Sequence, residues 1–252
     1  MRAAAFRAFC RLRDEFEERT REWAATAPWL AELQEELRET LGYGDYRVET
    51  PVVFNEALRE VEASSEPVFV LVADNPGKME QLARNRRYLV GQSGKLAEGW
   101  FRRELGIDFR KEVILINKTP LHTPKTAELR KLLVLADAKK PARRQALLEL
   151  LNESQRWMAT LARRLHETLG VPLWISGYGE LGPRGLFAPY SEALALEYGK
   201  APPSLRGGVL LFRHFSMNQF AIEMKEKRNP DLSLLSELER IGSDNRKRIL
   251  GW

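Results

Sequence analysis

The sequence contains one cysteine, Cys10, among its 252 residues. An intramolecular disulfide is therefore impossible, and zinc sites with four cysteine ligands and iron–sulfur clusters are excluded. The same scarcity is typical of a protein that works in a reducing cytoplasm, which is the location that we predict. Cys10 itself is interpreted as a small apolar residue within a helix.

Long apolar stretches are also missing. No run approaches the roughly 20 apolar residues that span a bilayer, so we predict no membrane partner. The arginine-rich residues 1–13 are followed by acidic residues rather than by the apolar segment of a signal peptide. The hydrophobic fraction of 44% and the charged fraction of 30% are ordinary for a globular protein. The net charge of +5 suits a polyanionic partner such as nucleic acid.

Several catalytic signatures are absent as well. The chain has no phosphate-loop motif, no Gly-x-Ser-x-Gly motif, and no Gly-x-Gly-x-x-Gly after the first apolar run. Its three histidines are His122, His166 and His214, and no metal-ligand spacing joins them. We therefore predict neither a metal nor another cofactor.

Four short apolar runs are present, at residues 68–73, 113–116, 171–176 and 209–212. Continuous, β-branched runs of this kind indicate parallel strands that are buried on both faces. Helical patterns alternate with them, which predicts one α/β domain over 1–252 with a four-stranded parallel sheet flanked by helices. An N-terminal helical extension covers about 1–45. The expected helices lie at 3–41 (broken at Pro28), 91–105, 126–135, 141–169, 217–227 and 232–241.

Polar segments follow the expected strands, where open α/β sheets bind their ligands. They are Asp74-Asn75-Pro76-Gly77, Asn117-Lys118, Gly177-Tyr178-Gly179 and His214-Phe215-Ser216. Each also has a purely structural interpretation. The first is an ordinary turn sequence, Asn117 could be a cap, and a lone histidine at a strand end is often structural. The arginines at 84, 86 and 87, before residues 88–95, indicate either a phosphate site at a helix start or a solvated loop.

Taken in chain order, these segments resemble the uracil-DNA glycosylase superfamily over residues 67–225. Asp74-Asn75-Pro76-Gly77 is similar to its first motif, which includes Gly-Glu-Ala-Pro-Gly and Gly-Ile-Asn-Pro-Gly, and Glu80 falls where the former type has a glutamate. Residues 88–94 resemble Pro-Phe-Val-Gly-x-Ala-Gly. Residues 116–120 resemble the strand-end asparagine segment, and His214-Phe215-Ser216 resembles the His-Pro-Ser motif.

The resemblance implies a monomeric DNA-repair enzyme with a glycosylase-like fold. It would hydrolyse the N-glycosidic bond of uracil or another deaminated base in DNA, as in base excision repair, on a flipped or single-stranded nucleotide. His214 would donate a hydrogen bond to the base, and Asp74 or Asn75 would handle the water. The substrate-binding residues would be Pro76, Gly77, Tyr88, Leu89, Asn117, Ser216 and Met217. Phosphate contacts would come from Arg84, Arg87, Lys95, Lys118 and Arg213.

Three positions depart from the family pattern. Phe215 replaces the proline, Ala73 replaces the first glycine, and Leu89 stands where a phenylalanine stacks on the base, a role that Tyr88 could take over. Two alternatives therefore remain: a nucleic-acid-binding member of the fold without catalysis, and a hydrolase or transferase of a small nucleoside-like metabolite.

Overall fold

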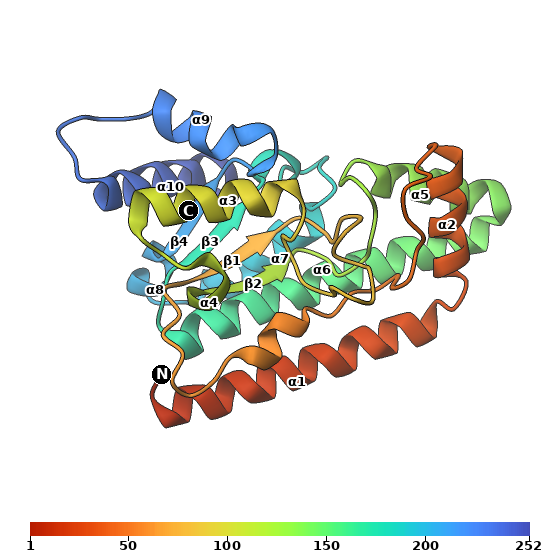
Figure 1. Ribbon diagram of the computed structural model, residues 1–252, viewed down its shortest axis with the longest axis horizontal. Coiled ribbons are helices and arrows are strands. Elements are labelled where there is room, and N and C mark those ends of the chain that lie inside the picture. Colours follow the sequence, from red (N-terminus) through yellow and green to blue (C-terminus); the bar gives the residue numbers. More distant parts are fainter.

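The computed structural model describes all residues from 1 to 252. Four parallel strands form one sheet in the order β2-β1-β3-β4, and helices cover both of its faces (Figure 1). This confirms the predicted α/β fold with a four-stranded parallel sheet. The strands are β1 (Phe69–Ala73), β2 (Val113–Asn117), β3 (Leu173–Ser176) and β4 (Val209–Phe212).

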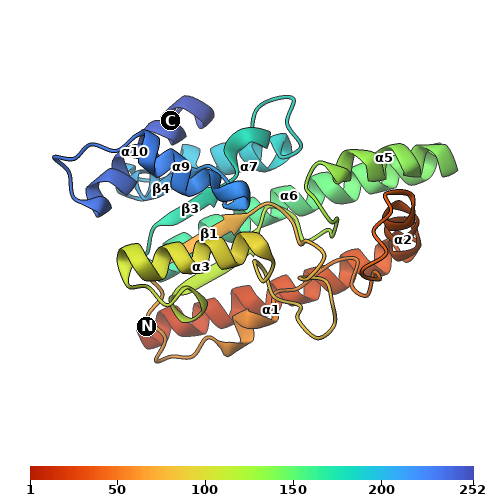
Figure 2. The same ribbon diagram turned by 45° about the horizontal axis from the view of Figure 1, so that its top comes forward.

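Every residue of the four strands is buried, because helices pack on both sides of the sheet. On one side lie α3 (Gln92–Leu105), α9 (Gln219–Glu226) and α10 (Leu234–Leu250). On the other lies α6 (Pro141–Leu169), which packs against α7 (Ala188–Gly199) and α1 (Ala3–Thr26) (Figure 2). The remaining helices are α2 (Leu30–Thr40), α4 (Phe109–Glu112), α5 (Glu128–Lys139) and α8 (Pro203–Gly207).

The N-terminal helix α1 belongs to the same hydrophobic core as the sheet. Phe16 stacks on Trp157 of α6 at 5.7 Å between ring centres, and Trp23 meets the same indole edge-on at 5.7 Å. Five apolar residues of α1 and α2 are buried: Phe9, Phe16, Trp23, Leu30 and Leu33. The extension is therefore packed onto α6 as an integral layer.

Several helical segments differ from expectation, and the short helices α4 and α8 were not predicted. Helix α7 was not predicted, because apolar residues lie all around it and leave no one-sided stripe. Helix α10 runs to Leu250 rather than to Ile241. Its polar Asn245 and Arg246 are buried, and they donate hydrogen bonds to the carbonyl oxygens of Leu211 (2.9 Å) and Val209 (2.9 Å) on β4. The polar residues at the end of α10 therefore face the edge strand β4 rather than solvent. None of the helices combines the length and the apolar character needed to cross a membrane.

Candidate functional site

A cavity of about 540 Å³ opens at the carboxyl edge of the sheet. We call it the edge cavity. It lies between the loop after β1, the loop after β2 and the segment after β4, because the carboxyl ends of parallel strands meet at one edge. Among its lining residues are seven that the sequence predicted: Asp74, Asn75, Gly77, Leu89, His214, Ser216 and Met217.

His214 follows β4 and has a defined tautomer. Its Nδ1 accepts a hydrogen bond from the backbone N–H of Ser216 (3.0 Å), and the Ser216 hydroxyl lies 2.8 Å from the same atom. A nitrogen that accepts carries no proton, so the proton of the neutral ring is on Nε2. Burial lowers the pKa of His214, while the charge of Asp74 raises it and that of Lys118 lowers it. The site thus holds a neutral imidazole whose Nε2–H is free to donate.

Asn75 is fixed through its amide nitrogen. Nδ2 donates to Oγ1 of Thr123 (2.9 Å) and to the carbonyl oxygen of Leu121 (3.3 Å). The Thr123 hydroxyl in turn donates to the carbonyl oxygen of Lys125 (3.0 Å). A flipped amide would place Oδ1 against these oxygens, so the orientation is set by the loop. The Oδ1 atom takes part in none of these hydrogen bonds, so Asn75 brings a free acceptor to the residues that line the edge cavity.

Asp74 is engaged through both carboxylate oxygens. Lys118 donates to Oδ1 (2.5 Å), and Thr126 donates to Oδ2 (3.3 Å). Lys118 is fully buried and also donates to the carbonyl oxygen of Ser176 (2.5 Å). The predicted phosphate contact at Lys118 is therefore wrong, because no external ligand can reach its amine.

Leu89 lines the edge cavity in a left-handed backbone conformation, with φ +53°. Its carbonyl oxygen accepts a hydrogen bond from Arg110 (2.7 Å) and lies against Gly94 in the first turn of α3. A side chain at Gly94 would start 1.3 Å from that oxygen, so only glycine permits this approach. The backbone therefore directs Leu89, rather than its neighbour, to the cavity.

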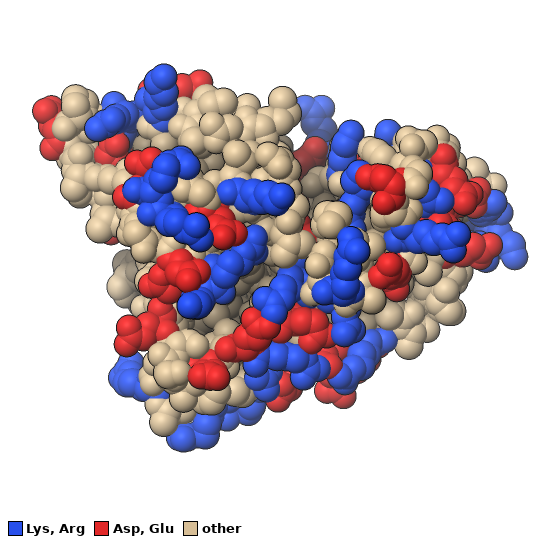
Figure 3. Space-filling model, in the orientation of Figure 1, with Lys and Arg blue, Asp and Glu red and all other residues tan.

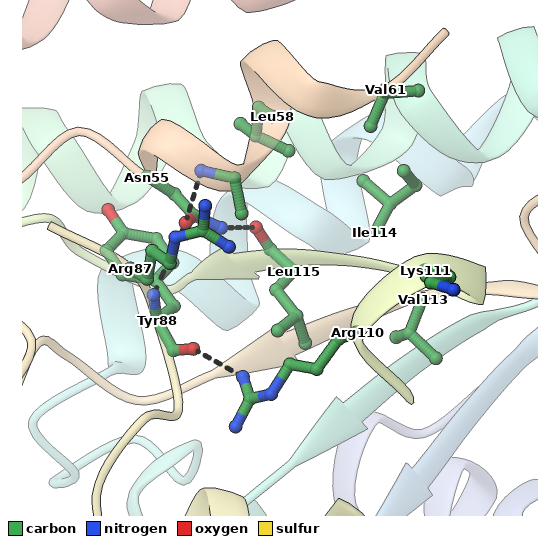
Figure 4. A pocket seen from close by; sticks show the side chains of 11 residues that line it. Asn55, Leu58, Val61, Arg87, Tyr88, Arg110, Lys111, Val113, Ile114 and Leu115 are labelled. Carbon is green, nitrogen blue, oxygen red and sulfur yellow. Dashed lines mark hydrogen bonds between the residues drawn. The ribbon is translucent and has the colours of Figure 1, made fainter. Parts of the chain in front are cut away.

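Tyr88 does not reach the edge cavity. Its hydroxyl donates to the carbonyl oxygen of Val53 (2.5 Å), and its backbone N–H donates to Asn55 (3.3 Å). Asn55 on one side and Arg110 on the other hold this segment (Figure 4). The structure therefore gives no support to base stacking by Tyr88. Arg87 lies beside Tyr88 and Asn55, away from the edge cavity, and forms an ion pair with Glu60.

Asn117 ends β2 beside Ala73, and the register places both on the sheet face that α3 covers. Ala73 lines the edge cavity, whereas Asn117 does not. The Asn117 side chain is 1% exposed, and its Nδ2 has no hydrogen-bond partner. An unpaired buried donor is costly, and such groups usually need a functional explanation. The edge cavity therefore ends at Ala73, and the amide lies behind its wall without an acceptor.

Two buried groups support the loop after β1. Glu80 accepts a hydrogen bond from the Gly77 N–H (3.2 Å), and burial raises the pKa of its carboxyl to about 7. His122 donates from Nδ1 to the carbonyl oxygen of Pro76 (2.9 Å), and burial lowers its pKa to about 4. Gln34 of α2 donates to the carbonyl oxygen of His122 (2.8 Å). Pro76 thus contributes through its backbone, and the N-terminal helices help to position the site. Sequence alone gave no signal for Gln34.

The segment after His214 combines a buried and an exposed residue. Phe215 is buried against Phe220 (4.9 Å) and Phe101 (6.0 Å between ring centres). Met217 is 83% exposed at the cavity rim and has φ +52°. A large apolar side chain held in water by an uncommon backbone conformation is typical of a binding surface rather than of a core.

Basic residues surround the cavity unevenly. Lys and Arg side chains gather over the face that carries the loop between β1 and α3 (Figure 3). Arg84 is exposed, makes no ion pair, and lines an open groove of about 800 Å³ beside this loop together with Arg38, Arg47 and Lys78. Lys95 is exposed in the first turn of α3. Arg213, next to His214, pairs with Glu226 (3.0 Å).

No side-chain cluster of three or more His, Cys, Asp or Glu is arranged to hold a metal ion. Comparison of the chain with models of known protein families and with curated proteins finds no match.

Proposed function

We propose that this chain is a DNA glycosylase of the uracil-DNA glycosylase type, which hydrolyses the N-glycosidic bond of uracil or another deaminated base. The observation that carries the proposal is the pairing of His214 and Asn75 on one cavity. His214 offers a free N–H donor and Asn75 a free carbonyl acceptor. A departing base needs the donor, and an attacking water needs the acceptor. The volume of about 540 Å³ is in the range of small-molecule sites.

Cleavage of the bond between C1′ and the base nitrogen leaves negative charge on the base. The Nε2–H of His214 donates to the base O2 as this charge develops. A donor that is fixed before the reaction stabilises the charged state without reorganising, and one such donor accounts for about 10²–10³ in rate.

Positive charge develops at the same time on the sugar. The Oδ1 atom of Asn75 accepts a hydrogen bond from water and turns the oxygen lone pair towards C1′. Asp74 is held by Lys118 and Thr126, so its carboxylate keeps a fixed position on the cavity wall near the sugar. Water adds to C1′, and the proton that it loses ends on the nitrogen of the released base.

Asn117 recognises the base in this proposal. Its Nδ2 is a buried donor without a partner at the end of β2, as the Ser176 hydroxyl is at the end of β3. An amide can pair with a carbonyl and an N–H of a pyrimidine edge. Leu89 then packs on the base from the α3 side. Ser216 orients His214 through its backbone N–H. Gly77 has no side chain, so it lets the DNA strand approach closely.

The exposed side chains near the edge cavity are the ones that contact DNA in this proposal. Met217 enters the base stack that the flipped nucleotide leaves, as apolar side chains do in kinked duplexes. Arg84 and Lys95 are exposed without ion pairs and contact phosphates. Arg87 and Arg213 are already paired with Glu60 and Glu226, so they contribute less.

The test is base release from an oligonucleotide with one uracil, single-stranded and paired, followed by alkaline cleavage. We expect strand cleavage with the wild-type protein and none with a thymine-containing control. Asn117→Ala should reduce release strongly while leaving the melting temperature within a few degrees. Absence of release from uracil, hypoxanthine, xanthine and mismatch substrates would refute the enzyme.

A second candidate is nucleic-acid binding without catalysis. It is favoured by the position of Asn117, which does not line the edge cavity. In that case the protein would bind DNA in a salt-dependent manner, and Asn117→Ala would leave the affinity unchanged.

A further inference from the structure

Lys118 is the one lysine whose side chain is completely buried. Its Nζ donates to Oδ1 of Asp74 (2.5 Å) and to the carbonyl oxygen of Ser176 (2.5 Å), and it lies 5.0 Å from the ring centre of Phe187. Strands β1, β2 and β3 therefore meet at one ammonium group. Since solvent does not reach this charge, its action on neighbouring groups is screened little.

The partner carboxylate is locked in place. Asp74 is held at Oδ1 by Lys118 and at Oδ2 by Thr126. Gly177 closes the third side, because a Cβ at this position would lie 2.6 Å from Oδ1. Asp74 and His214 together line the edge cavity and the smaller groove next to it. The two side chains therefore face the same space, and the charge of the carboxylate acts on the imidazole.

Glu80 and Lys125 line the edge cavity with His214, but Asp74 and Lys118 are the charges that shift its protonation. Burial disfavours its protonated form, Asp74 favours it, and Lys118 disfavours it. Two other charged groups line the smaller groove, and each has its own partner: Arg213 pairs with Glu226 (3.0 Å), and Glu180 pairs with Arg130 (2.7 Å). Without Lys118, the carboxylate of Asp74, which is 14% exposed, would stand unopposed on the same cavity as the ring. Such a neighbour stabilises imidazolium.

We infer that Lys118 is a positioning residue that cancels the charge of Asp74 and thereby keeps His214 neutral, with its proton on Nε2. Imidazolium would carry a proton on Nδ1 as well, and the Ser216 N–H that now donates to that atom would face another donor. Loss of the lysine would therefore disturb both the charge and the orientation of the ring. Only the use of this neutral donor in base release rests on the proposed function; the protonation itself is a property of the free protein.

The test is an NMR titration of the three histidines in the full chain. In Lys118→Met we expect the His214 pKa to rise by about one unit or more. In the double variant Lys118→Met/Asp74→Asn it should return to within about half a unit of the wild type, because both charges are gone. His166 on α6 is the internal control and should titrate unchanged.

An unchanged His214 in Lys118→Met would overturn the inference. The same conclusion would follow if the double variant remained as high as the single one, because packing rather than charge would then be responsible. If Lys118→Met does not fold, Asp74→Asn is compared with the double variant. The inference requires a lower His214 pKa in Asp74→Asn, where the lysine is unopposed, and equal values would reject it. A wild type that releases no base would refute the glycosylase and leave these titrations standing.

Discussion

The backbone N–H of Ser216 donates to Nδ1 of His214 at 3.0 Å, and this contact determines which ring nitrogen carries the proton. The hydrogen bond is local, two residues along the chain, so it forms whenever the turn after β4 forms. The donor at Nε2 is therefore present before any ligand binds, and donors fixed in advance are the most effective in stabilising developing charge.

Replacing His214 with alanine should lower the rate of uracil release by about 10²–10³, the range for loss of one such donor. Ser216→Ala should have a much smaller effect, because the backbone N–H remains. Single-turnover rates on a single-stranded oligonucleotide measure both. Equal losses in the two variants would show that the serine hydroxyl, rather than the backbone, sets the tautomer.

Glu80 makes stability depend on pH. Its folded-state pKa is about 7, raised by burial from 4.5, so the folded protein retains a proton that the unfolded chain releases. The stabilising contribution is complete below about pH 4.5 and is lost as the pH rises through 7. The loss is on the order of 3 kcal/mol. Glu80→Gln should match the wild type near pH 4.5 and exceed it near pH 8.5 in urea unfolding. If the free energies of unfolding of the wild type and Glu80→Gln differed by the same amount at every pH, the prediction would be wrong.

Phe215 should be important for stability rather than for chemistry. Its φ of −70° is the value that proline imposes, so the backbone already has the conformation of a His-Pro-Ser segment. Phe215→Ala should cost about 3–5 kcal/mol, because it empties a buried aromatic site. Phe215→Pro should also destabilise, without raising the rate of base release. A large gain in rate with proline would show that the phenylalanine limits turnover.

Met217→Ala should separate the two kinds of substrate. The side chain is 83% exposed, so unfolding free energy should change by less than about 0.5 kcal/mol. Release of uracil from duplex DNA should fall more than release from a single strand, because only the duplex has a stack to fill. Leu196→Ala is the matched control, as that residue is 81% exposed on α7. Equal effects on both substrates would argue against a wedge.

Arg84→Ala should weaken DNA binding and reduce the slope of log K against log salt by about 1. Arg87→Ala should change it less, since Glu60 already neutralises that guanidinium. Fluorescence anisotropy with an undamaged oligonucleotide at several salt concentrations makes the comparison. A larger change in slope for Arg87→Ala than for Arg84→Ala would show that the DNA phosphates follow the Arg87 side of the loop between β1 and α3.

The strands could be predicted because each is buried on both faces and is therefore apolar throughout. The edge that carries Asn75 and His214 followed from the parallel order alone. Lys118 could not be placed in this way: a lysine after a strand resembles a phosphate ligand, and its burial depends on Asp74 and Ser176 from two other strands. The choice between Tyr88 and Leu89 depends on a positive φ at Leu89, and the clearest trace of it in the sequence is Gly94.

Gly177 has a consequence for the history of this chain. With φ +79° and the Asp74 carboxylate against its Cα, it admits no side chain while the ion pair exists. Among descendants of the same ancestor, glycine at 177 should persist wherever Asp74 and Lys118 persist together. A larger residue there should accompany the loss of one of them, so a single position would record which lineages kept the ion pair.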